Sequence, residues 1–193
     1  RPGMMHGCGH DGHTAMLVGA ARYLAETRQF DGTAVLIFQP GEEGFAGAKA
    51  MIEDGLFDRF PCDAVFAMHN HPGAPQGRFL MRSGAFMAAG DRVFVTIRGV
   101  GGHAARPHLA VDPLVAAAAL VTSLQTVVSR NVDPAETAVV TVGRLRSGDA
   151  LNVIPDQAEL GISVRSFSAP VRALLKQRIT ELITGSRPAL GSS

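Results

Sequence analysis

Hydrophobic and polar positions change their period along this chain, and each period predicts a different element. Apolar side chains recur at helical spacing after Asp11, at Met16, Leu17, Ala20, Tyr23 and Leu24. Asp11 or Thr14 is a candidate cap for this helix. Two nearly continuous apolar runs, 33–39 and 64–68, are typical of strands buried on both faces of a parallel sheet. Between them a helix is expected from about Ala46 to Leu56.

The pattern changes after the small residues of Gly84 to Gly90. The segment 92–98 alternates polar and apolar residues with period two, as in a half-solvated antiparallel sheet. Further strands are predicted near 137–145 and 159–167, and helices at 112–129, capped by Asp112, and 169–184. The first region therefore reads as α/β and the second as a small two-layer α+β unit. We expect two domains, residues 1–88 and 89–193.

Composition and charge exclude several classes of partner. The chain has 193 residues, 46% of them hydrophobic, and a net charge of +1 from 18 basic and 17 acidic residues that are scattered along it. Such a balance predicts no binding to nucleic acid or to an anionic membrane. No apolar run approaches the ~20 residues of a membrane span, and the N-terminus lacks a secretory pattern. The two cysteines, Cys8 and Cys62, predict no disulfide framework, so a reducing, cytoplasmic location is expected.

Residues 6–13 place one cysteine and three histidines within a glycine-rich stretch, a composition that favours a transition metal over core packing. A zinc-like ion takes thiolate, imidazole and carboxylate ligands, and catalysis leaves one position for water. This chain supplies such a set in Cys8, His10, Glu43 and His69. Because a thiolate can bridge two ions, a dinuclear centre is chemically feasible.

The remaining polar residues of this region allow more than one role. Glu42, Glu43 and His69 follow the two apolar runs, and open α/β sheets bind ligands beyond the carboxyl ends of their strands. Adjacent carboxylates do not share one face of a helix or strand, so if one reaches a metal the other is available for proton transfer. His6 and His13 either orient a ligand from outside or, for His13, pack at the helix end.

Four motifs, at 5–16, 39–44, 68–69 and 101–108, resemble those of the M20 metallopeptidase family. Within it they are most similar to the aminoacylase-like branch, the N-acyl-amino-acid amidohydrolases and hippurate hydrolases. The resemblance extends to about Ile183. It implies a partial catalytic domain with a helix-flanked, mostly parallel sheet, and a smaller α+β lid and dimerisation domain. The chain is expected to be a central portion that lacks the upstream segment, the last metal-ligand histidine and the lid's final strand.

The resemblance also implies roles for individual residues. Cys8 would bridge two divalent ions (zinc, manganese, cobalt or nickel), with further ligands from His10, Glu43 and His69. Glu42 would be the general base that takes a proton from the activated water. In the lid, His103 would help hold the tetrahedral oxyanion, typically from the partner subunit.

Two residues of the lid match family positions that contact the substrate carboxylate, Asn152 and Arg165. Arginine suits this task because its planar fork binds a carboxylate bidentately. From residue type alone, Asn152 equally fits a simple turn and Arg165 an exposed strand position. The glycines of 99–102 do not indicate a nucleotide site, because no lysine follows and the spacing matches neither common fingerprint.

The resemblance implies metal-dependent hydrolysis of N-acyl or N-aroyl amino acids, such as hippurate, to a carboxylate and a free amino acid. The substrate would be a small molecule, and the enzyme a homodimer through the lid domain. Two alternatives stay open: an incomplete, inactive fragment that serves only as a dimerisation or weak metal-binding module, and a dipeptidase or carboxypeptidase of the same family.

Overall fold

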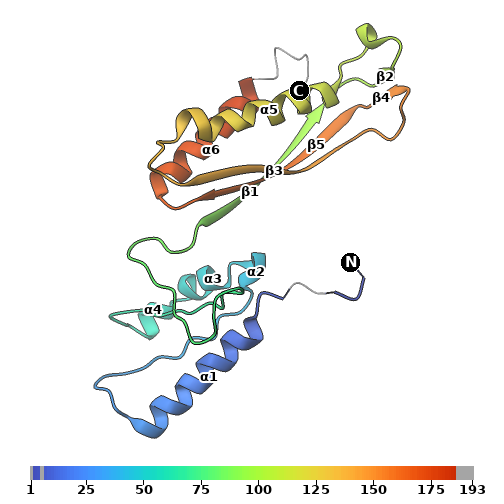
Figure 1. Ribbon diagram of the computed structural model, residues 1–193. Helices are drawn as coiled ribbons and strands as arrows, with labels where there is room; N and C mark the ends of the chain where they lie inside the picture. The colour runs from blue at the N-terminus through green and yellow to red at the C-terminus, as the bar shows by residue number, and fades with distance from the viewer. Residues whose placement is uncertain (1, 5–6, 186–193) are drawn as a thin grey trace. The chain divides into compact units, whose positions relative to one another are not determined.

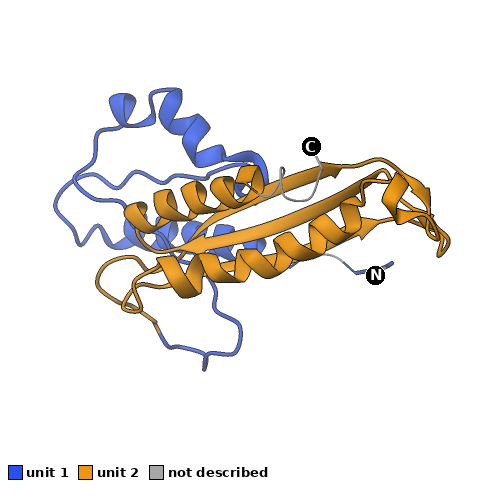
Figure 2. Ribbon diagram, turned by 90° about the horizontal axis from the view of Figure 1, so that it is seen from above, with its two compact units in different colours: residues 1–78 blue, residues 79–193 orange. Residues whose placement is uncertain are grey.

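The chain divides into two compact units, residues 1–78 and 79–193, in a computed structural model that describes residues 2–4 and 7–185 (Figures 1 and 2). The sequence pattern places this boundary at 88/89, behind the irregular segment 79–88, whereas the structure places it ahead of that segment. The mixed α/β class predicted from the sequence is confirmed, since helices and an antiparallel sheet are both present.

The first unit contains four helices among its described residues, α1 (His10–Thr27), α2 (Glu42–Phe45), α3 (Gly47–Glu53) and α4 (Leu56–Arg59). The helix expected from Ala46 to Leu56 corresponds to α3. The expected cap of the first helix is wrong, because α1 begins before Asp11 and its N-cap is Gly9, with φ 98° and no capping side chain. The Thr14 hydroxyl instead donates a hydrogen bond to the carbonyl of His10 at 2.9 Å.

The segments 33–39 and 64–68 are not strands in the described part of the chain, which corrects two predictions. Both lack a ladder partner there, and apolar side chains along them are exposed, among them Phe38 at 49% and Phe66 at 94%. A run of apolar, β-branched residues indicates that their side chains favour burial. A strand forms, however, only where another strand pairs with its backbone hydrogen-bonding groups.

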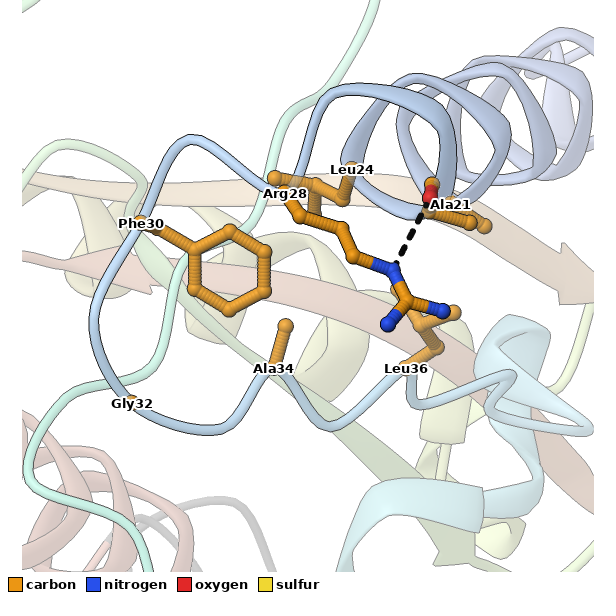
Figure 3. Close-up of a pocket in the computed structure, with 8 residues that line it drawn as sticks. Ala21, Leu24, Arg28, Phe30, Gly32, Ala34 and Leu36 are labelled. Atoms are coloured by element: carbon orange, nitrogen blue, oxygen red, sulfur yellow. Dashed lines mark hydrogen bonds between the residues drawn. The ribbon is translucent and has the colours of Figure 1, made fainter.

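A shallow hollow of about 420 Å³ lies where α1 ends and the chain turns into the segment 33–39 (Figure 3). Its walls are mostly apolar and come from Ala21, Leu24, Ala25, Arg28, Phe30, Gly32, Ala34 and Leu36. It belongs to the C-terminal end of α1, whereas the clustered cysteine and histidines belong to the N-terminal end of that helix. The hollow therefore takes no part in the site described below.

The second unit is a two-layer α+β unit, as predicted (Figure 1). Its described sheet has the antiparallel order β1 (Ala89–Arg98), β5 (Gln157–Ser166), β3 (Ala138–Ser147). The helices α5 (Pro113–Asn131) and α6 (Ala169–Gly185) lie side by side and pack on this sheet (Figure 2). A short antiparallel ribbon pairs β2 (Gly102–His103) with β4 (Val153–Ile154). The 3-10 turn η1 (Pro107–Leu109) follows β2 in the chain, and β5 follows β4.

Alternation along β5 builds the core of this unit. Every second residue from Ala158 to Val164 is buried, together with Leu124 of α5 and Leu175 of α6. Asp112 caps α5 as predicted, since its Oδ1 accepts from the backbone N–H of Leu114 at 2.8 Å. By length and composition α5 is apolar enough to cross a membrane, contrary to expectation, with 19 residues and a hydropathy of 1.3. One face of this helix packs against the sheet and α6, and 33% of its most apolar window is buried.

A bidentate ion pair joins β1 to α6. Arg172 donates from Nε and Nη2 to the two carboxylate oxygens of Asp91, at 2.7 and 2.6 Å. These hydrogen bonds lower the pKa of the Asp91 carboxyl below its usual value. The pair is partly exposed, with side-chain exposures of 54% for Arg172 and 35% for Asp91, so solvent screening keeps its contribution small.

Replacing Asp91 with asparagine is expected to lower the free energy of unfolding by roughly 0.5–1 kcal/mol at neutral pH. Because the folded-state pKa is depressed, this stabilisation is present above the unfolded pKa and is lost as the pH falls through the folded pKa. Urea denaturation at neutral pH and at about pH 3 checks this, with the two proteins converging in acid. Asp149→Asn, in an exposed loop, is the control; an equal effect of both substitutions would contradict the prediction.

Candidate metal centre

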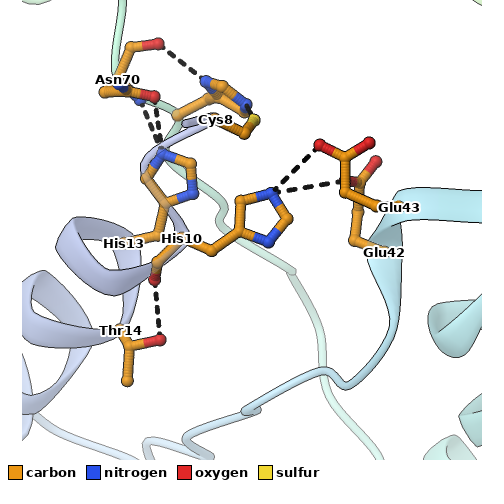
Figure 4. Close-up of polar contacts among 8 residues, drawn as sticks. Cys8, His10, His13, Thr14, Glu42, Glu43 and Asn70 are labelled. Atoms are coloured by element: carbon orange, nitrogen blue, oxygen red, sulfur yellow. Dashed lines mark hydrogen bonds and ion pairs between the residues drawn. The ribbon is translucent and has the colours of Figure 1, made fainter. Parts of the chain in front are cut away.

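The N-terminus of α1 positions the first two candidate ligands. Cys8 lies in the loop just before the helix, and His10 is its first residue, so the left-handed turn at Gly9 separates the two side chains (Figure 4). Glycine adopts this backbone conformation without the steric cost that a Cβ brings. The predicted position of the cluster, at a junction of loop and helix, is confirmed.

Glu42 and Glu43 reach the same place from the short turn of α2 (Figure 4). Their carboxylate oxygens lie 3.5 and 3.9 Å from Nε2 of His10. Adjacent residues of a regular helix point in different directions, but the backbone of Glu43, at φ −69° and ψ 79°, leaves the helical region. Both carboxylates therefore approach one imidazole.

His69, after the segment 64–68, completes the group from the far end of the unit's sequence. Its Nε2 lies 3.3 Å from Sγ of Cys8, and its Nδ1 lies 2.7 Å from the carbonyl oxygen of Asn70. A carbonyl only accepts, so Nδ1 carries the proton and donates it. Nε2 is consequently unprotonated, and its lone pair faces the cysteine. A histidine that binds a metal through Nε2 adopts this same tautomer, with the proton on Nδ1.

These residues fit a divalent transition metal. The ligand atoms of Cys8, His10 and Glu43 all lie within 4.8 Å of one another. Tetrahedral zinc holds a thiolate sulfur and an imidazole nitrogen roughly 3.6 Å apart, given its usual bond lengths. The separation of 3.3 Å between Cys8 and His69 is close to that value. The group also crowds two carboxylates beside a thiol, an arrangement that a cation stabilises.

The thiol of Cys8 shows the effect of this crowding. Desolvation, together with the negative charges of Glu43 and Glu42, raises the pKa of Cys8 above its ordinary value. In the metal-free protein the thiol therefore keeps its proton at neutral pH, and binding of a metal displaces that proton.

Zinc affinity is accordingly expected to rise with pH, by about tenfold per unit from about pH 7 up to the raised pKa of the thiol. Competition with a chromophoric chelator at a series of pH values measures this slope. Cys62→Ser, at an exposed cysteine, should leave the slope unchanged, whereas Cys8→Ser should reduce it. A zinc affinity that is constant above about pH 7 would speak against a thiolate ligand.

The other sequence-predicted residues belong to the second unit. His103 is paired with Val153 across the β2–β4 ribbon, and the carbonyl of Asn152 accepts a hydrogen bond from the backbone of Ala104 at 3.0 Å. The backbone N–H of Ala105 donates to Nδ1 of His103 at 3.1 Å, so the proton of the neutral imidazole resides on Nε2. The ribbon thus brings His103 and Asn152 together, with a hydrogen-bond donor on the imidazole.

Arg165 is separated from that ribbon by the length of the sheet. It lies near the end of β5, opposite Gly90 of β1, and its guanidinium covers that glycine so closely that a Cβ there would collide with it. Gln157, at the start of β5, is eight residues away, which corresponds to about 26 Å of strand. Arg165 and the ribbon that carries His103 therefore lie toward opposite ends of β5.

Sequence reasoning did not single out Asn70, although the structure places it among the ligands. Its backbone carbonyl accepts from His69, and its side-chain oxygen lies 2.8 Å from Nε2 of His13. The available signal was the position of an amide directly after a metal-ligand histidine. His13 contacts the group from α1, as one of its two predicted roles allows, and His6 lies outside the described residues.

The chain is similar in sequence to two bacterial hydrolases. The chain is 47% identical over 182 residues to the hippurate hydrolase of Campylobacter jejuni, and 46% identical over 188 residues to the N-acetyl-L-cysteine deacetylase of Bacillus subtilis. These matches cover 94% and 95% of this chain but 47% and 45% of the relatives. The chain thus spans about half the length of the relatives that it matches.

Similar solved structures and a family sequence pattern identify the family of this chain. A crystal structure from methicillin-resistant Staphylococcus aureus aligns with a TM-score of 0.88 and 38% identity, covering 99% of this chain and 51% of that one. The YXEP protein of Bacillus subtilis, described as a dinuclear metal binding peptidase of the M20 family, aligns at 0.73 with 35% identity, covering 98% and 47%. The pattern of peptidase family M20/M25/M40 matches residues 1–189, and this chain belongs to that family.

Proposed function

We propose that the protein is a metal-dependent amidohydrolase that cleaves N-acyl or N-aroyl amino acids into a carboxylate and a free amino acid. The observation that carries this proposal is the convergence of Cys8, His10, Glu43 and His69, with the Glu42 carboxylate 3.5 Å from one of them. The names of the relatives, a hippurate hydrolase and a deacetylase of an N-acetylated amino acid, support this class of substrate.

Cys8, His10, Glu43 and His69 would hold the divalent ions, and Glu42 would act as the base. When bound, such ions polarise the amide carbonyl and make a water acidic enough to lose its proton near neutral pH. Glu42 takes that proton and later returns it to the departing amine nitrogen. Its neighbour Glu43 stays on the ligand side, which divides two adjacent carboxylates between two tasks.

His103, Asn152 and Arg165 would act on the substrate itself. The Nε2–H of His103 is a donor suited to the oxyanion of the tetrahedral intermediate, and Arg165 suits the carboxylate of the amino acid. Arg165 lies about 26 Å along β5 from Gln157, the end of the strand that follows the β2–β4 ribbon with His103, so one substrate would meet both residues only if they came from different subunits. This separation supports a homodimer in which each site borrows His103 and Asn152 from its neighbour.

The proposal is tested on the protein at its natural length, with hippurate, N-acetyl amino acids and simple dipeptides as substrates. Added zinc, manganese, cobalt or nickel should give release of the free amino acid from the N-acyl compounds, and a chelator should abolish it reversibly. Faster cleavage of dipeptides would favour a peptidase of the same family. No hydrolysis of any amide, with metal bound, would overturn the proposed function.

A further inference from the structure

His13 is held among the candidate ligands although it lies outside the trio whose ligand atoms converge (Figure 4). The centre of its imidazole ring is 5.5 Å from that of His10 and 4.4 Å from that of His69. His10 and His13 are three residues apart on α1, so they share one face of the helix. His13 thus fills the space between two imidazoles that come from distant parts of the unit.

Asn70 holds His13 in this position through two of its atoms. Nε2 of His13 lies 2.8 Å from the side-chain Oδ1 of Asn70 and 3.0 Å from its backbone nitrogen. A ring nitrogen either donates or accepts, depending on the tautomer. One of these two contacts is therefore a hydrogen bond in each neutral tautomer of His13.

Asn70 also contacts the start of α1 and the neighbouring ligand. Its side-chain amide packs over Gly9, where a Cβ would lie 2.7 Å from Nδ2, so the glycine leaves room for it. Its carbonyl accepts the proton of Nδ1 of His69, which turns Nε2 of that ring toward Cys8. The contacts between His13 and Asn70 therefore connect the two chain segments that carry Cys8 and His69.

We propose that His13 is a positioning residue of the metal centre. Cys8 and His69 are 61 residues apart in sequence, and both belong to irregular segments. Other contacts must therefore hold Sγ of Cys8 at 3.3 Å from Nε2 of His69. The contacts between His13 and Asn70 hold the two segments together in the metal-free protein. Metal binding then has to order less of the chain. This inference rests on the proposed function, because it assumes that Cys8 and His69 hold the same ion.

The test titrates cobalt(II) into the metal-free protein at its natural length and follows the absorption of the bond between the thiolate and cobalt. His13→Ala is expected to weaken cobalt binding by about 10–100-fold. His13→Gln should restore much of the affinity, because the glutamine amide ends near the place of Nε2. His13→Asn should not, because its amide ends near the place of Nδ1. His71→Ala, at an exposed histidine beside the same loop, should bind cobalt as the wild type does.

The outcomes separate the two proposals. A wild-type protein without thiolate–cobalt absorption overturns the metal centre and this inference with it. A wild type with that absorption, joined by His13→Ala with equal affinity, overturns the inference alone. If circular dichroism shows that His13→Ala does not fold, the pair of amide variants decides: equal cobalt affinities of His13→Gln and His13→Asn would overturn the role of the Nε2 contact.

Discussion

Replacing Glu42 with glutamine is expected to reduce kcat by about 10²–10⁴-fold while the metal stays bound. The carboxylate of Glu42 lies beside the ligand group, 3.5 Å from His10, but outside the trio of converging ligand atoms. Glutamine keeps the shape of the side chain and cannot take a proton from water. Steady-state kinetics with an N-acyl amino acid, together with metal analysis of the same sample, measures both quantities.

The neighbouring residue is the matched control. Glu43→Gln removes a carboxylate that lies with Cys8 and His10, so its first effect should be loss of metal rather than loss of base. An excess of metal should then recover part of the activity of Glu43→Gln and none of that of Glu42→Gln. The opposite pattern would exchange the roles of the two residues, and full activity of Glu42→Gln would remove the general base from the mechanism.

Mixing two inactive variants is expected to restore activity. In a dimer of Glu42→Gln with His103→Ala, one site combines both defects, and the other combines an intact Glu42 with an intact His103 from the other subunit. Random pairing makes half of the dimers mixed, which gives about one quarter of the wild-type activity. The variants are mixed under conditions that exchange subunits, and hydrolysis of an N-acyl amino acid is followed over time.

The control for this experiment is a mixture of Glu42→Gln with Cys8→Ser, both in the first unit. Glu42 and Cys8 both belong to the metal centre, so each of the two sites in a mixed dimer carries one defect. Such a dimer has no intact site and should stay inactive. If His103 instead acts within its own subunit, the mixture of Glu42→Gln with His103→Ala also stays inactive, and the borrowed-residue arrangement is wrong.

The second unit is the part of the fold that the sequence predicts best. Its strands alternate with period two because one face of the sheet is covered by α5 and α6, and Asp112 caps α5 by a local hydrogen bond. Both signals arise from interactions that the described chain itself contains. The strands expected at 33–39 and 64–68 do not form, because no strand among the described residues pairs with them.

The candidate site shows the same limit. Cys8 and His10 are recognisable because their chemistry is concentrated in a few residues, and Glu42, Glu43 and His69 because they follow apolar runs. Asn70 was missed, since its contacts with His13 and His69 depend on the path of the backbone and not on residue type. The distance between Arg165 and His103 likewise follows from strand register, which sequence patterns do not specify.

The exposed apolar runs have a practical consequence for handling the molecule. Phe66, at 94% exposure, and Phe38 lie on irregular segments that have no strand partner in the described residues. Such segments can template strand addition between molecules. A recombinant polypeptide of just these 193 residues should therefore tend to precipitate from concentrated solution, and charged substitutions at these two phenylalanines should keep it dispersed.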